Sequence, residues 1–109
     1  MLEPLLGSAD SERVLLFITE RGEGYGRQIA DFWGCSVTGI QRRLDRLESG
    51  GVLQAKGVGR TRVYTWNLRW PFSQELQALM RKGIAFLPDE QRMRLQEDRR
   101  RPRRRGKPQ

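Results

Sequence analysis

Residues 36–51, SVTGIQRRLDRLESGG, have apolar side chains at helical spacing between two recognisable helix ends. Ser36 is a favourable N-cap, because its hydroxyl can accept a hydrogen bond from a free amide of the first turn. Gly50 and Gly51 can stop the helix, because glycine adopts the left-handed conformation without strain. The stripe that such a helix would bury consists of Val37, Ile40, Leu44 and Leu47. The pattern therefore predicts an amphipathic helix over residues 36–49.

The opposite face of this helix is small near its start and basic in its middle. It consists of Thr38, Gly39, Arg42, Asp45, Arg46 and Ser49. A helix that enters the major groove of DNA needs small residues near the base edges and guanidinium groups that reach guanine or phosphate. An ordinary amphipathic surface helix has the same periodicity, so the neighbouring segments must decide between the two interpretations.

Two further helices are expected upstream. The first spans about Ala9–Arg21, because Ser8 and its neighbours are good N-caps. Its centre, Val14–Ile18, is apolar all round and so must be covered on more than one side. One side can face the domain core, and the other a C-terminal helix or a partner subunit. A second helix over about Gly26–Trp33 and a short glycine-containing turn then complete a helix-turn-helix pattern.

The hydrophobic period changes after Gly51, which predicts a β-hairpin. Residues 52–56 and 61–67 read as strands, joined by the glycine-rich turn at 57–60. Tyr64 and Trp66 are expected to pack on the helices, because an isolated hairpin is marginally stable in water. Arg60 and Arg62 near the tip suit contact with phosphate or the minor groove. Because a basic helix lies directly upstream, we interpret the hairpin as a DNA-binding wing rather than an ordinary solvated hairpin.

A further amphipathic helix is expected after Trp70 and Pro71. Its stripe consists of Phe72, Leu76, Leu79, Met80, Ile84 and Leu87, and Gly83 beside it would permit close helix approach. This stripe could cap the core within one chain or pair with its copy. We favour a homodimer, because palindromic DNA sites match two-fold symmetric proteins. A further polar helix over 90–98 has only Met93 and Leu95 to attach it to the core.

The charge distribution points to a polyanionic partner. The chain has 109 residues and a net charge of +8, and seven basic residues without an acidic one lie between Arg99 and the C-terminus. The remainder is nearly neutral but polarised, with seven basic and two acidic residues over 42–69. Residues 99–109 are predicted to be disordered. They could act as a DNA-binding arm whose contribution falls with salt, or only as a solubilising tail.

Several functional classes are disfavoured. The chain has one cysteine, Cys35, and no histidine, so neither an internal disulfide nor a Cys/His metal site is expected. Cys35 could be a redox switch with a lowered pKa, although a half-buried turn residue is the simpler interpretation. There is no membrane-spanning run or signal-peptide pattern, which indicates a cytoplasmic protein. We expect no enzyme activity, no catalytic residues, no metal and no cofactor.

The segment from about Ser11 to Phe72 resembles the winged helix-turn-helix domain of small prokaryotic transcriptional regulators, ArsR-like or MarR-like in style. The resemblance rests on RVLLFI, on YGRQIADFWGCSVTGIQRRLDRLESGGVL and on GRTRVYTWN. It implies a mainly α fold with a small β-hairpin: a three-helix core, a wing and a C-terminal amphipathic helix. The expected division is residues 1–70 for DNA binding, 71–98 for a helical segment suited to dimerisation, and 99–109 for the tail.

The resemblance also implies the site residues. The base-reading positions of the family fall on Ser36, Val37, Thr38, Gln41 and Arg42, and its wing positions fall on Arg60 and Arg62. Among these, Gln41 would read adenine and Arg42 guanine or phosphate, while Arg43 and Arg46 would hold the backbone. Metal sensing, known in ArsR-like proteins, is in doubt because this chain lacks the Cys/His ligands.

The resulting hypothesis is a homodimeric, sequence-specific regulator of transcription, a repressor, bound to double-stranded DNA. Two alternatives remain. The stretch GRTRVYTWNLRWPF also resembles stand-alone winged helices that lie near, or are fused to, nucleotidyltransferase-like proteins, which suggests a protein-interaction module. The second alternative is RNA binding, for which the arginine-rich tail is equally suited.

Overall fold

The computed structural model describes the backbone of residues 1–100 and the side chains of residues 1–97. Within residues 1–100, six helices and one hairpin follow each other in the order α1 (Glu3–Leu6), α2 (Ala9–Arg21), α3 (Gly26–Trp33), α4 (Val37–Ser49), β1 (Leu53–Val58), β2 (Thr61–Trp66), α5 (Ser73–Ala85) and α6 (Asp89–Arg100). The helix α6 extends two residues beyond the expected end at Asp98, into the segment predicted to be disordered. The rest of that segment, 101–109, lies outside the described residues.

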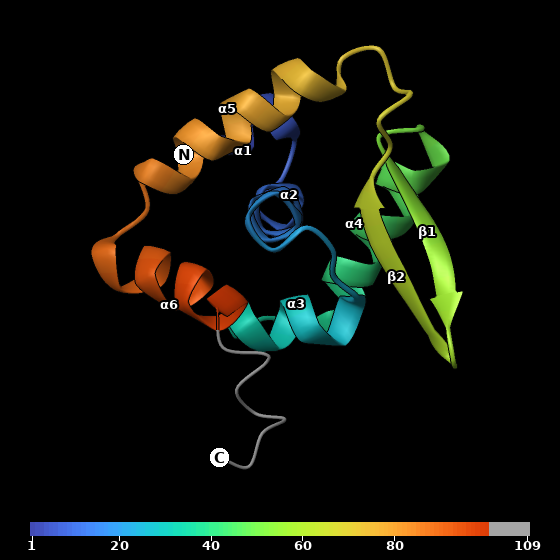
Figure 1. Ribbon diagram of the computed structural model, residues 1–109, viewed down its shortest axis with the longest axis horizontal. Helices are drawn as coiled ribbons and strands as arrows, with labels where there is room; N and C mark the ends of the chain where they lie inside the picture. The colour runs from blue at the N-terminus through green and yellow to red at the C-terminus, as the bar shows by residue number, and fades with distance from the viewer. Residues whose placement is uncertain (101–109) are drawn as a thin grey trace.

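Helix α2 is the centre of the fold. Figure 1 looks along this helix and shows the other helices and the hairpin arranged around it. All five residues of Val14–Ile18 are almost completely buried, which explains why this stretch has no polar face. The prediction that it is covered on more than one side is confirmed. The covering elements include α5 and α6 of the same chain, so no partner subunit is needed to bury it.

Helices α3 and α4 form the predicted helix-turn-helix. Helix α3 ends at Gly34, whose φ of 70° is in the left-handed region that favours glycine. The Ser36 hydroxyl then caps α4 by accepting a hydrogen bond from the amide of Thr38 at 3.2 Å. Gly39, which the sequence pattern placed on the outward face, instead lies against the Asp10 carboxylate of α2, where a side chain would collide. Its small size therefore serves the approach of two helices within the chain.

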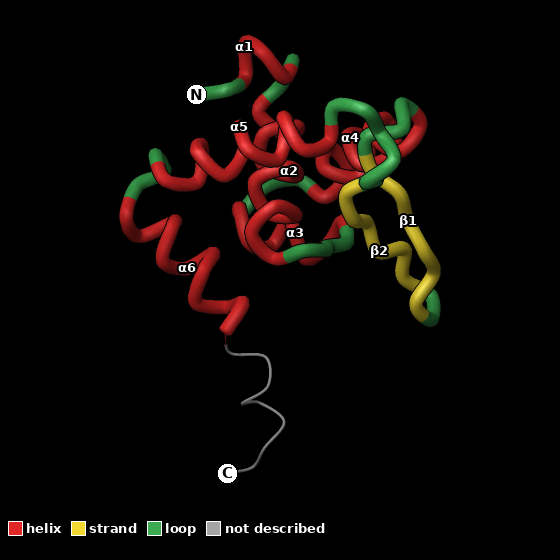
Figure 2. The backbone as a smooth tube through the Cα atoms, turned by 45° about the horizontal axis from the view of Figure 1, so that its top comes forward, coloured by secondary structure: helices red, strands yellow, loops and turns green. Residues whose placement is uncertain are grey.

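The hairpin packs on the helical core through aromatic residues of β2. Tyr64 is fully buried and Trp66 is 6% exposed, which confirms their predicted role. The indole of Trp66 donates a hydrogen bond to the Thr19 hydroxyl at 3.2 Å. The backbone of Tyr64 also exchanges two hydrogen bonds with Gly24, so a short bridge occupies the outer edge of β2. The strands pair in antiparallel register from Leu53–Trp66 to the tight turn at Gly59, and the hairpin projects from the helical body (Figure 2).

The apolar stripe of α5 covers the core of its own chain. Met80 and Ile84 are buried against α2, as is Leu87 beyond the end of α5, which corresponds to the capping alternative rather than to pairing with a copy. Gly83 lies close to Leu16 of α2, where its lack of a side chain permits the contact. Phe72, expected in the same stripe, is 62% exposed because it precedes the first turn of α5.

Helix α6 returns to the same core. Leu95 is fully buried, whereas Met93 points outward. The guanidinium of Arg94 lies 4.4 Å from the centre of the Phe32 ring and donates a hydrogen bond to the Phe32 carbonyl at 3.0 Å. Residues 1–70 and 71–98, predicted as separate segments, therefore share one hydrophobic core. Among residues 1–100, no helix is long and apolar enough to cross a membrane.

Candidate nucleic-acid interface

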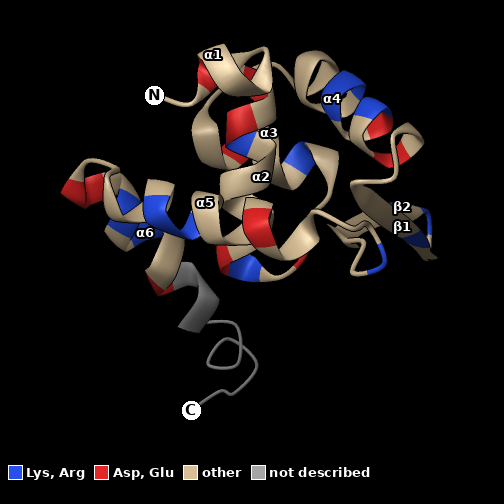
Figure 3. Ribbon diagram, turned by 90° about the horizontal axis from the view of Figure 1, so that it is seen from above, with Lys and Arg blue, Asp and Glu red and all other residues tan. Residues whose placement is uncertain are grey.

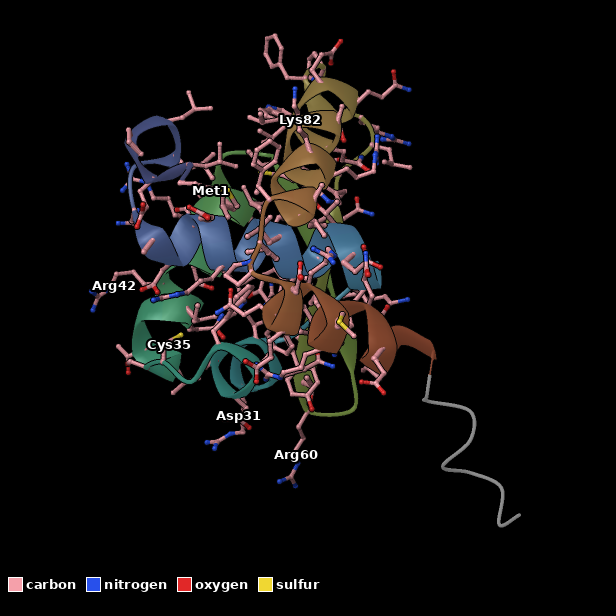
Figure 4. All side chains as sticks on the ribbon, turned by 90° about the vertical axis from the view of Figure 1, so that its left-hand side faces the viewer. Met1, Asp31, Cys35, Arg42, Arg60 and Lys82 are labelled. Carbon is pink, nitrogen blue, oxygen red and sulfur yellow. The ribbon has the colours of Figure 1, made fainter. Side chains whose placement is uncertain are left out.

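The outward face of α4 is accessible to a large ligand. Ile40 and Leu44 are fully buried on the inner side and so fix the rotation of the helix about its axis. Thr38, Arg42 and Arg46 are consequently exposed on the other side. Figure 4 shows the Arg42 side chain projecting away from the body of the protein. Of the other predicted contact residues on this helix, Ser36 and Val37 are exposed, while Arg43 and Gln41 are half-buried.

A shallow hollow lies on this face. It has a volume of about 450 Å³ and is lined by Val37, Thr38, Gln41, Arg42 and Asp45. These residues are spaced at one and two turns along α4, so they belong to one stripe of the helix. The hollow combines the methyl groups of Val37 and Thr38 with the cationic side chain of Arg42 and the anionic side chain of Asp45. Such a combination can distinguish base pairs by their major-groove edges.

Three side chains connect this hollow to the wing. The Tyr64 hydroxyl donates a hydrogen bond to Oδ1 of Asp45 at 3.2 Å. The Gln41 amide nitrogen donates to the same Oδ1 and to the Tyr64 hydroxyl, both at 3.0 Å. Its amide oxygen lies so close to Gly26 that a side chain there would collide with it. Both amide protons of Gln41 are therefore used within the chain, which differs from the expectation that this residue reads adenine.

Arg62 also makes contacts within the chain. Its guanidinium donates to Glu48 of α4 at 2.5 Å and to the Tyr64 hydroxyl at 3.5 Å. Both hydrogen bonds raise the pKa of Arg62 above its usual value, and the one to Tyr64 is the larger cause. Arg62 thus connects the wing to α4, which the sequence pattern did not predict.

Arg60 is the wing cation that faces outward. It follows Gly59 in the turn between β1 and β2, and Figure 4 shows its side chain extending beyond the hairpin. In the part of the chain that the structure describes, it has no ion-pair partner. Figure 3 shows basic segments on α4 and on the hairpin. The structure therefore places Arg60, Arg42 and Arg46 on the surface, as expected, and assigns Arg62 and Gln41 to internal contacts.

Asp45, Glu48 and the Tyr64 hydroxyl were not among the predicted site residues. The spacing of Gln41 and Asp45 is one helical turn, a signal for a side-chain hydrogen bond that the sequence does contain. The participation of Tyr64 could not be read in this way, because it depends on how closely the hairpin approaches α4.

Cys35 lies in the turn before α4 and is half-buried. Burial, together with the Asp10 carboxylate, raises the pKa of its thiol, and the nearby Arg13 guanidinium offsets only part of this rise. A redox-sensing thiol normally has a lowered pKa, so the structure favours the simpler interpretation of a turn residue. Within residues 1–97, no cluster of three or more histidine, cysteine, aspartate or glutamate side chains could hold a metal ion.

No protein-family model and no curated protein sequence matches this chain. The structure is similar to that of the YusO protein from Bacillus subtilis, with a TM-score of 0.58 and 16% identity over 93% of this chain and 78% of YusO. It is also similar to a mutant of Lactococcus lactis ZitR in its apo form. For ZitR the TM-score is 0.50 and the identity 15%, over 76% of this chain and 72% of the other.

The chain has a winged-helix fold. The likeness to YusO spans nearly the whole chain, so it concerns the fold as a whole rather than one segment. In this fold, α4 is the second helix of the helix-turn-helix and the β1–β2 hairpin is the wing. The predicted fold class is therefore confirmed, with α5 and α6 as additions that cover α2.

Proposed function

We propose that this winged-helix protein binds double-stranded DNA in a sequence-specific manner and regulates transcription, as a repressor. The observation that carries the proposal is the exposed face of α4, with Arg42 and Arg46 turned outward and the Arg60-tipped wing beside it. An α-helix fits the major groove, and a neighbouring hairpin can contact the backbone or the minor groove. A repressor could act by occupying a site that the transcription machinery needs.

The exposed side chains divide into two groups by chemistry. Thr38, Val37 and Arg42 line the hollow, so they are assigned to the bases: methyl groups suit thymine and a guanidinium suits guanine. The other exposed or half-buried candidates do not line it and are assigned to phosphates, which fix the register of the protein on the duplex. They are Ser36, Arg43, Arg46 and, at the wing tip, Arg60. The arginine-rich residues at the C-terminus would add affinity that is independent of sequence.

A homodimer is part of the proposal. Because Met80 and Ile84 are buried within the chain, a dimer must use other apolar residues. Large apolar side chains that are exposed include Leu5 of α1 (67%), and Phe72 (62%) and Phe86 (70%) at the two ends of α5. A two-fold arrangement would present two α4 helices to a palindromic site. Sedimentation equilibrium of the protein and of Phe86→Ser would test this, with a dimer expected only for the unchanged chain.

The test of DNA binding is a titration of short random-sequence duplexes across a salt series. We expect binding at low salt and a linear decrease of log K with log salt, because phosphate contacts release counterions. Duplex RNA of matched length serves as the competitor. Absence of binding at low salt would refute the proposal, and stronger competition by RNA than by DNA would favour the RNA-binding alternative. Truncation after Asp98 should reduce the salt slope and leave the base preference unchanged.

A further inference from the structure

Asp45 is an acidic residue on a surface that is otherwise suited to a polyanion. It is exposed and lines the hollow of α4 together with Arg42. Among the described residues it has no arginine or lysine within ion-pair distance, although Arg42 and Arg46 lie on the same helix. An unpaired carboxylate opposes the approach of phosphates. Its presence at this position therefore weakens binding to DNA in general, unless a particular base offers it a hydrogen-bond donor.

The orientation of Asp45 is fixed by its neighbours. Oδ1 accepts hydrogen bonds from both Gln41 and Tyr64, at 3.0 Å and 3.2 Å. Tyr64 is itself immobilised, because it is fully buried and its backbone is paired with Gly24. No protein donor to the second oxygen, Oδ2, occurs in the described part of the chain. A carboxylate held through one oxygen presents the other in a defined direction, which reduces the entropy lost on binding.

We infer that Asp45 reads the exocyclic amino group of a cytosine in the major groove, an inference that rests on the proposed function. Cytosine presents the N4 amino donor there, and carboxylates accept from it. Adenine also presents an amino group, but its neighbouring N7 is an acceptor that would repel the carboxylate. Guanine and thymine present acceptors at the corresponding position.

Arg42 supplies the complementary half of this readout. It lies on the same stripe of α4, three residues before Asp45, and borders the same hollow. A guanidinium binds the O6 and N7 acceptors of guanine, whereas the carboxylate binds the cytosine donor. Arg42 and Asp45 together therefore favour a G·C base pair, or two adjacent ones, opposite the hollow. Gln41 acts as a positioning residue, because its amide protons hold Asp45 and Tyr64 rather than a base.

The test is a selection of bound duplexes from a random library, carried out with the unchanged protein and with Asp45→Asn. The asparagine carbonyl can still accept from Gln41 and Tyr64, while its amide group replaces Oδ2 by a donor. We expect a cytosine in the unchanged protein's motif, preferred by roughly tenfold. Asp45→Asn should change the preferred base at this one position from cytosine to thymine or guanine, which offer acceptors. Asp31→Asn, an exposed aspartate on α3, is the matched control and should leave the motif unchanged.

A second measurement keeps the test independent of how well the variant folds. In the selected duplex, the cytosine is replaced by 2-pyrimidinone, which lacks the amino group. The unchanged protein should bind this duplex roughly tenfold more weakly, because one hydrogen bond to a charged acceptor is lost. Undiminished binding, or a cytosine preference that persists in Asp45→Asn, would overturn the inference while DNA binding stands. Enrichment of no sequence at all would refute sequence-specific binding itself.

Discussion

The hydroxyl of Tyr64 donates a hydrogen bond to Oδ1 of Asp45 at 3.2 Å, and this contact joins the wing to the middle of α4. The same hydroxyl accepts from Gln41 at 3.0 Å and from Arg62 at 3.5 Å. One buried oxygen therefore fixes the position of both elements that we propose to contact DNA. A rigid relation between helix and wing is what recognition of a fixed duplex geometry requires.

Removing this hydroxyl by Tyr64→Phe should lower the free energy of unfolding by about 1–2 kcal/mol, because a half-buried amide donor loses its acceptor. The ring remains, so no cavity forms. Urea unfolding followed by circular dichroism measures the change. Tyr25→Phe is the matched control, because Tyr25 is an exposed tyrosine outside the contact between the wing and α4, and it should change stability by less than about 0.5 kcal/mol. Equal stabilities of the two variants would contradict the role assigned to the Tyr64 hydroxyl.

Arg42→Ala and Arg60→Ala should weaken DNA binding in different ways. Arg60 at the wing tip is assigned to phosphate, so its loss should reduce the salt slope by about one and affect all sequences equally. Arg42 is assigned to a base, so its loss should reduce the difference between preferred and random duplexes by about 1–3 kcal/mol. Fluorescence anisotropy at several salt concentrations measures both effects. Lys82→Ala on α5, which Figure 4 shows far from both arginines, should have no effect. A larger effect of Lys82→Ala would place the interface on α5.

Glu48→Gln should strengthen binding to DNA. Glu48 holds the Arg62 guanidinium at 2.5 Å and adds negative charge beside α4. Neutralising it releases Arg62 toward a phosphate, and one new contact steepens the salt slope by about 0.9. The matched variant is Glu75→Gln, an exposed glutamate on α5, which should leave the slope unchanged. An unchanged or shallower slope for Glu48→Gln would show that Arg62 is not available to DNA even when released.

Leu95→Ala and Met93→Ala should differ strongly in stability. Leu95 is fully buried against the core, whereas Met93 is 59% exposed on the same helix. Truncating a buried leucine costs about 2–5 kcal/mol, while an exposed side chain costs less than about 0.5 kcal/mol. Thermal or urea unfolding of the two variants measures this. If both behaved alike, α6 would not belong to the core of the winged-helix domain.

Cys35 should react slowly with iodoacetamide in the folded protein. Burial raises the pKa of its thiol above the usual 9.0, so the reactive thiolate is scarcer at pH 8 than in the unfolded chain. The rate should continue to rise with pH beyond 9. The unfolded thiol loses its proton at a lower pH than the folded one. The free energy of unfolding is therefore unaffected below the pKa of the unfolded thiol, and it decreases as the pH rises from there towards the pKa of the folded thiol. Mass spectrometry of alkylation in buffer and in urea tests the difference, and faster labelling of the folded form would contradict it.

Much of the fold follows from local sequence signals. The Ser8 and Ser36 caps predicted where α2 and α4 begin, and Gly50 and Gly51 predicted where α4 ends, because each acts on the turn next to it. The five apolar residues of Val14–Ile18 required cover on several sides, which the structure provides. The covering elements could not be chosen from the sequence, because the stripe of α5 is equally suited to its own core and to a second copy.

The candidate site was predictable in outline only. The exposure of Thr38, Arg42 and Arg46 followed from helical periodicity, which requires no tertiary information. Gln41 and Arg62 both donate hydrogen bonds to the Tyr64 hydroxyl. The distance of Tyr64 from α4 is set by how the hairpin packs on the core, which the sequence pattern does not show. A side chain with several polar atoms can be assigned to a ligand only when its partners within the chain are known.

The central claim is that DNA contacts α4 and the wing, and NMR spectra of the labelled protein titrated with a duplex test it most directly. We expect the largest amide chemical-shift changes over residues 36–46 and 58–62, and small ones over α5. Changes concentrated on α5 or confined to the C-terminal arginines, with α4 unaffected, would contradict the assignment of α4 as the recognition helix.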